Sequence, residues 1–344
     1  MTVLDEIIEY LHYHSGVSRR ELTEGAQLSL KDTQVKDWIS RGIESGDIKV
    51  EGKGKATKYS LSAKGKLLHT INLDTYYNNP LMRREVQTGY NFELIRNELP
   101  SIDIFTADEY RFLTDRENAF RERMKNYPKE LYAKEMERLG IDLSWKSAQI
   151  EGNTYTLLET VNLLKDKIEA EGKKREEAVM LLNHKSALKA IIERPEWFQR
   201  LSIAKIEDLH SILIEELGVD RNLRHARVGI SGTNYRPLEV ESQIREAMED
   251  MVSLVNVKSD PYEKALLSLL LIAYIQPFMD GNKRTSRLTA NACLLAAGVC
   301  PLSFRSVEAD DYRAALLLFY EQNNVSAFKR IFLEQVEFAC NEYF

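Results

Sequence analysis

The sequence "IQPFMDGNKRTSR", residues 275–287, joins two apolar segments of helical length. The first segment, "KALLSLLLIAYI", is apolar around most of its circumference, which indicates a helix at the centre of a bundle. Pro277 ends this helix near Gln276, because the residue before a proline avoids helical backbone angles. The second segment, "TSRLTANACLLAAG", has helical periodicity and stops at Gly298. We therefore expect a buried helix and a second helix with one apolar stripe, joined by a tight turn.

The turn has the composition of an anion site. Gly281 permits backbone angles closed to other residues, so successive N–H groups can converge at the N-terminus of the second helix. Lys283, Arg284 and Arg287 add fixed positive charge. Asp280 is a hard carboxylate suited to Mg²⁺ beside phosphate oxygens. The alternative is an ordinary corner between two helices with a solvated basic start.

Composition limits the remaining functions. The 344 residues carry 53 acidic and 47 basic side chains, a net charge of −6, so nothing draws the whole chain to nucleic acid or an anionic membrane. The N-terminus resembles no targeting peptide and the most apolar run is too short for a bilayer, so we expect a cytoplasmic protein without membrane contact. Cys293, Cys300 and Cys340 lack metal-ligand spacing and are expected to be packed thiols.

Residues 1–65 form a separate pattern of three helices followed by two β-like runs, "DIKVEG" and "TKYSLS". This order resembles a winged helix-turn-helix. In such a module the third helix would enter the DNA major groove and the wing would meet phosphates. The basic residues placed there are Lys31, Lys36, Arg41, Lys53, Lys55 and Lys58. Because the segment holds ten basic and ten acidic residues, the alternative is a module for protein contact or dimerisation.

The rest of the chain is expected to be mainly α. Residues 66–104 mix turn signals with short helical patterns and read as a connector, and residues 105–344 form the second domain. One β-like stretch, "ARVGISGTNYRP" at 226–237, alternates Val228 and Ile230 around a Gly-Thr-Asn turn and predicts a hairpin.

The opening stretch resembles the signature of the Fic family, H-x-F-x-[DE]-G-N-[GK]-R-x-x-R. Every position matches except the first, where Gln276 replaces histidine. The matching residues are Phe278, Asp280, Gly281, Asn282, Lys283, Arg284 and Arg287. The resemblance covers about residues 70–344 and implies a Fic-type helical bundle.

Two further stretches support the resemblance. "KSAQIEGN" resembles the family's inhibitory motif [ST]-x-x-x-E-[GN], on a helix near 144–152, with Ser147, Glu151 and Gly152 in its fixed positions. In the family this glutamate pairs with the last motif arginine, here Arg287, and blocks seating of the nucleotide's γ-phosphate. The alternative is a surface glutamate at a helix end.

The second stretch, "LRHARVGISGTNYRPLE", resembles the family's flap, which holds the target segment in line with the nucleotide. Val228, Gly229 and Ile230 would then pair with an extended target peptide by strand addition.

The resemblance implies AMP transfer from ATP to a Ser, Thr or Tyr hydroxyl of a target protein. Asp280 would bind Mg²⁺, Asn282 and the turn backbone the α-phosphate, Arg284 the β-phosphate and Arg287 the γ-phosphate. Phe278 would anchor the turn in the core.

Gln276 puts the transfer step in question. The family's histidine is the general base, and glutamine cannot accept a proton near neutral pH. A positioned base supplies about 10²- to 10⁴-fold in rate. We therefore expect intact nucleotide binding and reduced or absent transfer. Of the six histidines, only His225, beside the expected flap, is a candidate substitute base. These six are His12, His14, His69, His184, His210 and His225.

Two alternatives follow from the same residues. One is a non-catalytic ATP-binding sensor that regulates transcription through residues 1–65. The other is transfer of a different phosphate-bearing group, since Lys283 stands where glycine is usual and resembles the relative Doc. A homodimer is compatible with a winged-helix chain.

Overall fold

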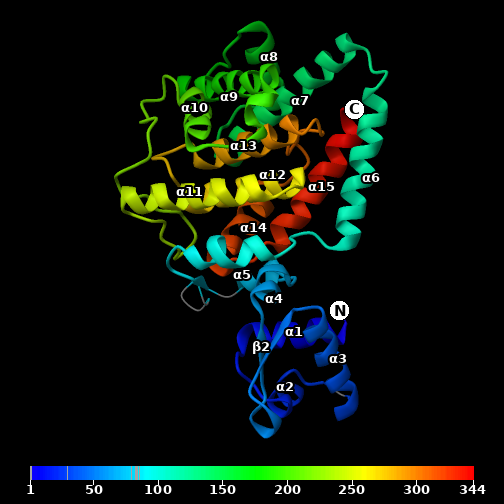
Figure 1. The fold of residues 1–344 in the computed structure, drawn as a ribbon. Helices are drawn as coiled ribbons and strands as arrows, with labels where there is room; N and C mark the ends of the chain where they lie inside the picture. The colour runs from blue at the N-terminus through cyan, green and yellow to red at the C-terminus, as the bar shows by residue number, and fades with distance from the viewer. Residues whose placement is uncertain (1, 29, 79, 82–83, 85) are drawn as a thin grey trace. The chain divides into compact units, whose positions relative to one another are not determined.

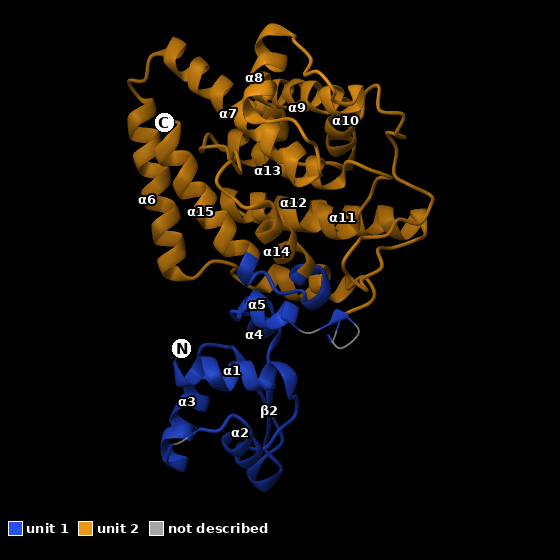
Figure 2. Ribbon diagram, turned by 180° about the vertical axis from the view of Figure 1, so that it is seen from behind, with its two compact units in different colours: residues 1–86, 318–327 blue, residues 87–317, 328–344 orange. Residues whose placement is uncertain are grey.

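A computed structural model describes residues 2–28, 30–78, 80–81, 84 and 86–344. Parts of the expected connector, at 79, 82–83 and 85, lie outside the described residues. The chain divides into two compact units, residues 1–86 with 318–327 and residues 87–317 with 328–344 (Figure 2). The mainly α class expected from the sequence is confirmed.

The first unit begins with three helices and a two-stranded sheet (Figure 1). The helices are α1 (Val3–Tyr13), α2 (Arg19–Gly25) and α3 (Asp32–Glu44), and the strands are β1 (Ile48–Glu51) and β2 (Lys58–Leu61). The strands are antiparallel with Ile48 opposite Leu61. Thr2 and Ser18 cap α1 and α2 through capping boxes. Two short helices follow, α4 (Ala63–Leu68) and α5 (Leu73–Asn78).

The second unit is a helical bundle. After a π turn (Leu94–Glu98) and a 3₁₀ turn (Leu99–Ser101), its helices are α6 (Ala107–Met124), α7 (Lys129–Ile150), α8 (Leu157–Asp166), α9 (Arg175–Glu193), α10 (Ile203–Leu213), α11 (Glu241–Val257), α12 (Pro261–Ile275), α13 (Asn282–Ala296), α14 (Ala309–Gln322) and α15 (Ser326–Glu342), with a 3₁₀ turn (Pro195–Gln199) before α10. Residues 318–327, which include the end of α14 and the start of α15, are assigned to the first unit.

Helix α12 lies at the centre of this unit, as predicted, and packs against α13 (Figure 1). Every residue from 265 to 275 of α12 is buried, because its apolar character extends around the helix. Asp260 caps the helix by accepting from Glu263 N at 2.8 Å. α13 starts at Asn282, three residues before the predicted apolar segment, and packs against α7, α9 and α10. The motif's cations therefore lie on the helix itself.

The predicted hairpin at 226–237 does not form as a pair of strands. This stretch is a loop with a turn at 231–232, and the two-stranded hairpin of the described chain is β1–β2. Side chains anchor the loop instead: Arg224 donates to Ala226 O at 2.8 Å, and Tyr235 Oη to Tyr274 O at 2.9 Å. Alternation of Val228 and Ile230 predicts extended backbone, but a ladder also needs a partner strand.

Two other expectations were tested by the described residues. Cys293, Cys300 and Cys340 are free thiols and buried. Within the described part of the chain, none of the helices combines the length and the apolarity needed to cross a bilayer.

Candidate functional site

The side chain of Asn282 closes the turn between α12 and α13. Its Oδ1 accepts from Phe278 N at 2.8 Å, and its Nδ2 donates to Phe278 O at 2.8 Å and to Gln276 Oε1 at 3.0 Å. Both Nδ2 protons are therefore committed inside the turn. Asn282 thus shapes the turn, and its backbone N–H is the group left to face an anion.

Removing the Asn282 side chain should destabilise the turn and, with it, the folded protein. Asn282→Ala leaves the buried N–H and C=O groups of Phe278 unpaired, so we expect the free energy of unfolding to fall by about 2–4 kcal/mol. Denaturant titration measures the loss. Asn282→Asp is the matched variant for the donor: it keeps an acceptor for Phe278 N but turns a carboxylate oxygen against Phe278 O and Gln276 Oε1, so it should also lose stability. A loss below about 1 kcal/mol for the alanine variant would contradict this role.

Gln276 has a left-handed backbone (φ 52°, ψ 59°) and is 8% exposed. Its Nε2 donates to Ala273 O at 2.6 Å, while its Oε1 accepts from Asn282. Its carbonyl oxygen accepts from Arg224 Nε at 2.6 Å. The amide therefore bridges the end of α12 to the start of α13, and in this conformation it does not present a free acceptor to a ligand.

The charged groups of the turn differ sharply in burial. The Arg284 side chain is 2% exposed, and that of Asp280 is 66% exposed although the two are paired at 3.1 Å. Arg284 Nη1 is buried and has no hydrogen-bond partner among the described residues. Burial lowers the pKa of Arg284, opposed by Asp280 and Glu151. An unpaired buried cationic donor is costly, so a bound anion would stabilise it.

Asp280 is also the residue that fits a divalent cation. Its Oδ1 accepts from Gly281 N at 2.6 Å, but the carboxylate faces solvent. The described residues contain no cluster of three His, Cys, Asp or Glu that could hold a metal alone. A single carboxylate is suited to Mg²⁺ that takes its other ligands from phosphates and water.

Glu151, at the end of α7, pairs with two cations of α13. Its Oε1 lies 2.9 Å from Arg287 Nη2 and its Oε2 lies 3.0 Å from Lys283 Nζ. Arg287 also donates to Ser147 Oγ and Ser147 O, both at 2.9 Å. Burial alone would raise the pKa of Glu151, but Arg287 and Lys283 outweigh it and hold the pKa below its usual value. The structure thus brings Ser147 and Glu151 together with the cations of α13.

Sequence reasoning missed Arg313 of α14. It donates to Ile150 O through Nε at 3.0 Å and through Nη2 at 2.6 Å. The last carbonyls of a helix lack intrahelical partners, so this cation fixes the end of α7 next to Glu151. Gly152 then leaves the helix with φ 96°, a conformation that glycine tolerates.

Two histidines of the neighbouring helices also border the site. The His210 ring stacks on Phe278 with centroids 3.6 Å apart, and burial lowers its pKa below the usual value. Burial, then the Arg287 and Arg284 charges, lowers the pKa of His184 to about 3. Both rings are therefore neutral near pH 7. Both histidines lie at buried positions of their helices, so the sequence pattern did not distinguish them from ordinary core residues.

The candidate base His225 lies in the loop after α10. Its side chain is 67% exposed and its Nδ1 is 3.6 Å from Glu241 Oε2. Further along this loop, Val228, Gly229 and Ile230 make no backbone hydrogen bond with the rest of the described chain. Their N–H and C=O groups are free to pair with an added strand.

The candidate DNA-binding residues lie in the first unit. Lys36 and Arg41 are exposed on α3, where Arg41 lies over the Trp38 ring at 4.4 Å. Lys53 and Lys55 are exposed between β1 and β2. DNA binding stays a prediction.

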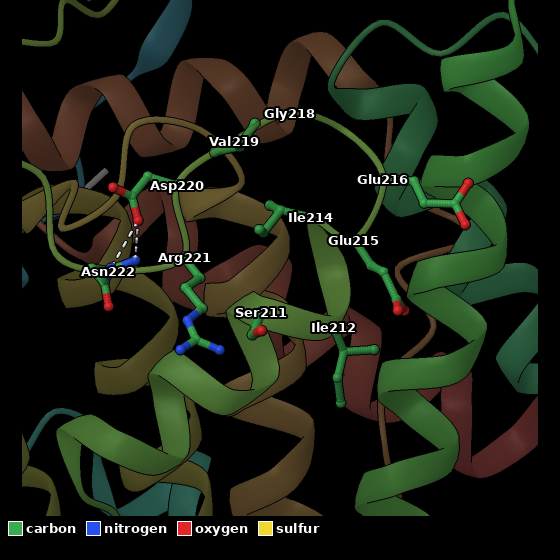
Figure 3. A pocket seen from close by; sticks show the side chains of 10 residues that line it. All are labelled: Ser211, Ile212, Ile214, Glu215, Glu216, Gly218, Val219, Asp220, Arg221 and Asn222. Atoms are coloured by element: carbon green, nitrogen blue, oxygen red, sulfur yellow. Dashed lines mark hydrogen bonds between the residues drawn. The ribbon is translucent and has the colours of Figure 1, made fainter.

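A pocket of about 510 Å³ is lined by residues between Ser211 and Asn222 (Figure 3). It is formed by the end of α10 and the following loop, and a Cβ on Gly281 would come within 3.3 Å of its wall at Ile214. Its lining includes three carboxylates, Glu215, Glu216 and Asp220. Because these would repel phosphate, the turn and not this pocket is the better anion site.

Comparison with known proteins agrees with this geometry. Residues 200–294 match the Fic/DOC family model. "Protein adenylyltransferase Fic" of Nematostella vectensis is 32% identical over 181 residues, 49% of this chain and 40% of that protein. The Drosophila willistoni protein of the same name is 27% identical over 202 residues, 58% of this chain and 40% of that protein.

Solved structures share the fold. Fic-1 (residues 134–508) of C. elegans has a TM-score of 0.58 at 20% identity. The match covers 69% of this chain and 72% of the Fic-1 chain. A Fic domain-containing signaling protein of Bacteroides thetaiotaomicron has a TM-score of 0.56 at 16% identity. The match covers 67% of this chain and 96% of the Bacteroides chain.

The helical bundle and its turn therefore define a Fic-like fold. Residues 200–294 of the chain match the Fic/DOC family, and about half of the chain is similar in sequence to Fic adenylyltransferases. The chain spans about 40% of the length of the curated relatives it matches.

Proposed function

We propose that this protein is a Fic-type adenylyltransferase scaffold that binds ATP with Mg²⁺ and is held inactive by Glu151. The observation that carries the proposal is the ion pair between Glu151 and the fully buried Arg287, 136 residues apart in sequence. A buried arginine beside an anion-binding turn is a site for phosphate, and here a carboxylate occupies it.

The resemblance to the Fic signature supports an assignment of these residues to the three phosphates. The N–H groups of Gly281 and Asn282 face the α-phosphate at the start of α13. Arg284, with its unpaired Nη1, takes the β-phosphate, and Arg287 takes the γ-phosphate once Glu151 withdraws. Asp280, with its solvent-facing carboxylate, would hold Mg²⁺, and that ion would neutralise phosphate charge when bound.

AMP transfer needs one further group. A target hydroxyl oxygen attacks the α-phosphorus, the bond to the bridging oxygen breaks, pyrophosphate leaves and the hydroxyl proton requires an acceptor. Gln276 cannot take that proton, and its amide is already bonded to Ala273 and Asn282. We propose nucleotide binding with weak or absent transfer, to a Ser, Thr or Tyr hydroxyl on a segment paired with residues 228–230.

Calorimetric titration with MgATP tests the binding step. We expect weak binding by the wild-type protein, clear binding by Glu151→Gly, and loss of that binding when Arg284→Ala is added. The arginine variant is the control, since it removes a phosphate contact without touching the inhibitory motif. If neither wild type nor Glu151→Gly binds nucleotide, the proposed function is wrong.

The side-chain amide of Gln276 is already hydrogen-bonded to Ala273 and Asn282. The lack of a base there also favours a second function, a non-catalytic ATP sensor that acts on DNA through residues 1–65. It predicts DNA binding that changes with ATP and no self-labelling by Glu151→Gly. Transfer of another phosphate-bearing group is the third option, and mass spectrometry of any labelled product separates it from AMP transfer.

A further inference from the structure

We infer that His210 is a positioning residue for the anion site, because its hydrogen bond to Asp280 O fixes the direction of the Gly281 N–H group. This inference rests on the proposed nucleotide binding. His210 belongs to α10, and none of the sequence motifs includes it.

His210 contacts the turn in three ways. Its Nε2 lies 2.9 Å from Asp280 O, and its ring covers the face of Phe278 with an interplanar angle of 5°. Its Nδ1 lies 3.2 Å from Arg221 O in the loop after α10. Carbonyl oxygens only accept, and a neutral imidazole has a single N–H. We place that proton on Nε2, which has the nearer carbonyl, so that Nε2 donates to Asp280 O.

The direction of one peptide group follows from this bond. A trans peptide is planar, with its N–H opposite its C=O. Since the carbonyl of Asp280 points to His210, the N–H of Gly281 points away from α10. It is now bonded to Asp280 Oδ1 at 2.6 Å, a carboxylate oxygen in the place of an anion. A phosphate oxygen can take over the same donor.

Glycine makes this fixation necessary. Gly281 has φ 80°, which only glycine adopts easily, and the same freedom lets the preceding peptide rotate at low cost. An unfixed donor must be ordered when a ligand binds, and that ordering weakens affinity. His210 removes this freedom before the nucleotide arrives.

The same contacts exclude His210 as the missing base. Both ring nitrogens face backbone carbonyls and one ring face is covered by Phe278. A general base needs a nitrogen within reach of the substrate hydroxyl.

Three substitutions at this position test the inference in the Glu151→Gly background. His210→Phe keeps the stacking and removes the hydrogen bonds. His210→Gln places a donor near the position of Nε2, and His210→Asn places one near Nδ1. We expect the phenylalanine and asparagine variants to bind MgATP about tenfold more weakly, and the glutamine variant to stay within about twofold of the parent.

Hydrogen exchange of the peptide covering 279–285, without nucleotide, provides the second measurement. His210→Phe should speed exchange there and His210→Gln should restore protection. Unchanged affinity and exchange in His210→Phe overturn the inference. Equal losses in the phenylalanine and glutamine variants also overturn it, because they indicate packing alone. If Glu151→Gly binds no ATP, the proposed function fails, while exchange still decides whether His210 fixes the turn.

Discussion

Replacing Glu151 with glycine is expected to destabilise the nucleotide-free protein by about 3 kcal/mol and to strengthen MgATP binding about tenfold or more. The two effects have one origin. Glu151 is the carboxylate that compensates the fully buried Arg287, so its removal leaves a buried cation unpaired. The same removal frees Arg287 for a phosphate group, which restores the compensation.

The second ion pair of Glu151 should strengthen its opposition to nucleotide binding beyond what the pair with Arg287 alone would give. Lys283 Nζ holds the other carboxylate oxygen of Glu151, and Arg313 fixes the preceding carbonyl of Ile150. Withdrawal of Glu151 must therefore break both pairs, and we expect the fraction of protein ready to accept a γ-phosphate to be small. Apparent affinity falls in proportion to that fraction.

Protons should not relieve this inhibition near neutral pH. The folded-state pKa of Glu151 lies below its unfolded value of about 4.3, so the carboxylate's contribution to stability is complete above that pH. It is lost only as pH falls through the folded-state pKa. The affinity gain of Glu151→Gly should therefore be the same at pH 6 and pH 8.

Thermal unfolding with and without MgATP measures both effects together. Glu151→Gly should melt below wild type without nucleotide and gain more from adding it, as expected for a ligand that binds the folded state. Glu151→Gln keeps the shape without the charge and should fall between the two. An equal nucleotide-induced shift in wild type and Glu151→Gly would contradict the inhibitory role.

The sequence predicted the parts of this site that depend on local spacing. Pro277, Gly281 and the apolar segments on either side place the turn, because each acts on its own stretch of backbone. The inward role of Asn282 was not predictable from composition, since an asparagine at the start of a helix can face either a ligand or the turn.

Contacts between distant elements account for what was missed. Lys283 was predicted as a phosphate ligand, yet its partner in the free protein is Glu151 of α7. His210 and Arg313 act through backbone carbonyls of other elements, which no side-chain pattern encodes. The hairpin expected at 226–237 did not form for a related reason: extended backbone is a local property, but strand pairing is not.

Gln276→His is expected to raise AMP transfer by about 10²- to 10⁴-fold in the Glu151→Gly background, or about 3–5 kcal/mol of barrier. Histidine tolerates the left-handed backbone that Gln276 adopts. One ring nitrogen can donate to Ala273 O as the amide does now, which leaves the other as an acceptor. Labelled ATP and intact-protein mass spectrometry detect the product.

Gln276→Ala is the matched control, because it breaks the bridge to Ala273 and Asn282 without supplying a base. Transfer by the alanine variant equal to that of the histidine variant would mean that the amide merely blocks the site. Tight ATP binding without transfer by Gln276→His would favour the sensor function, since the phosphate groups would then be bound with a base present and no reaction. Transfer by Gln276→His alone would show that the turn is already arranged for chemistry, and that this chain differs from an active transferase by one proton acceptor.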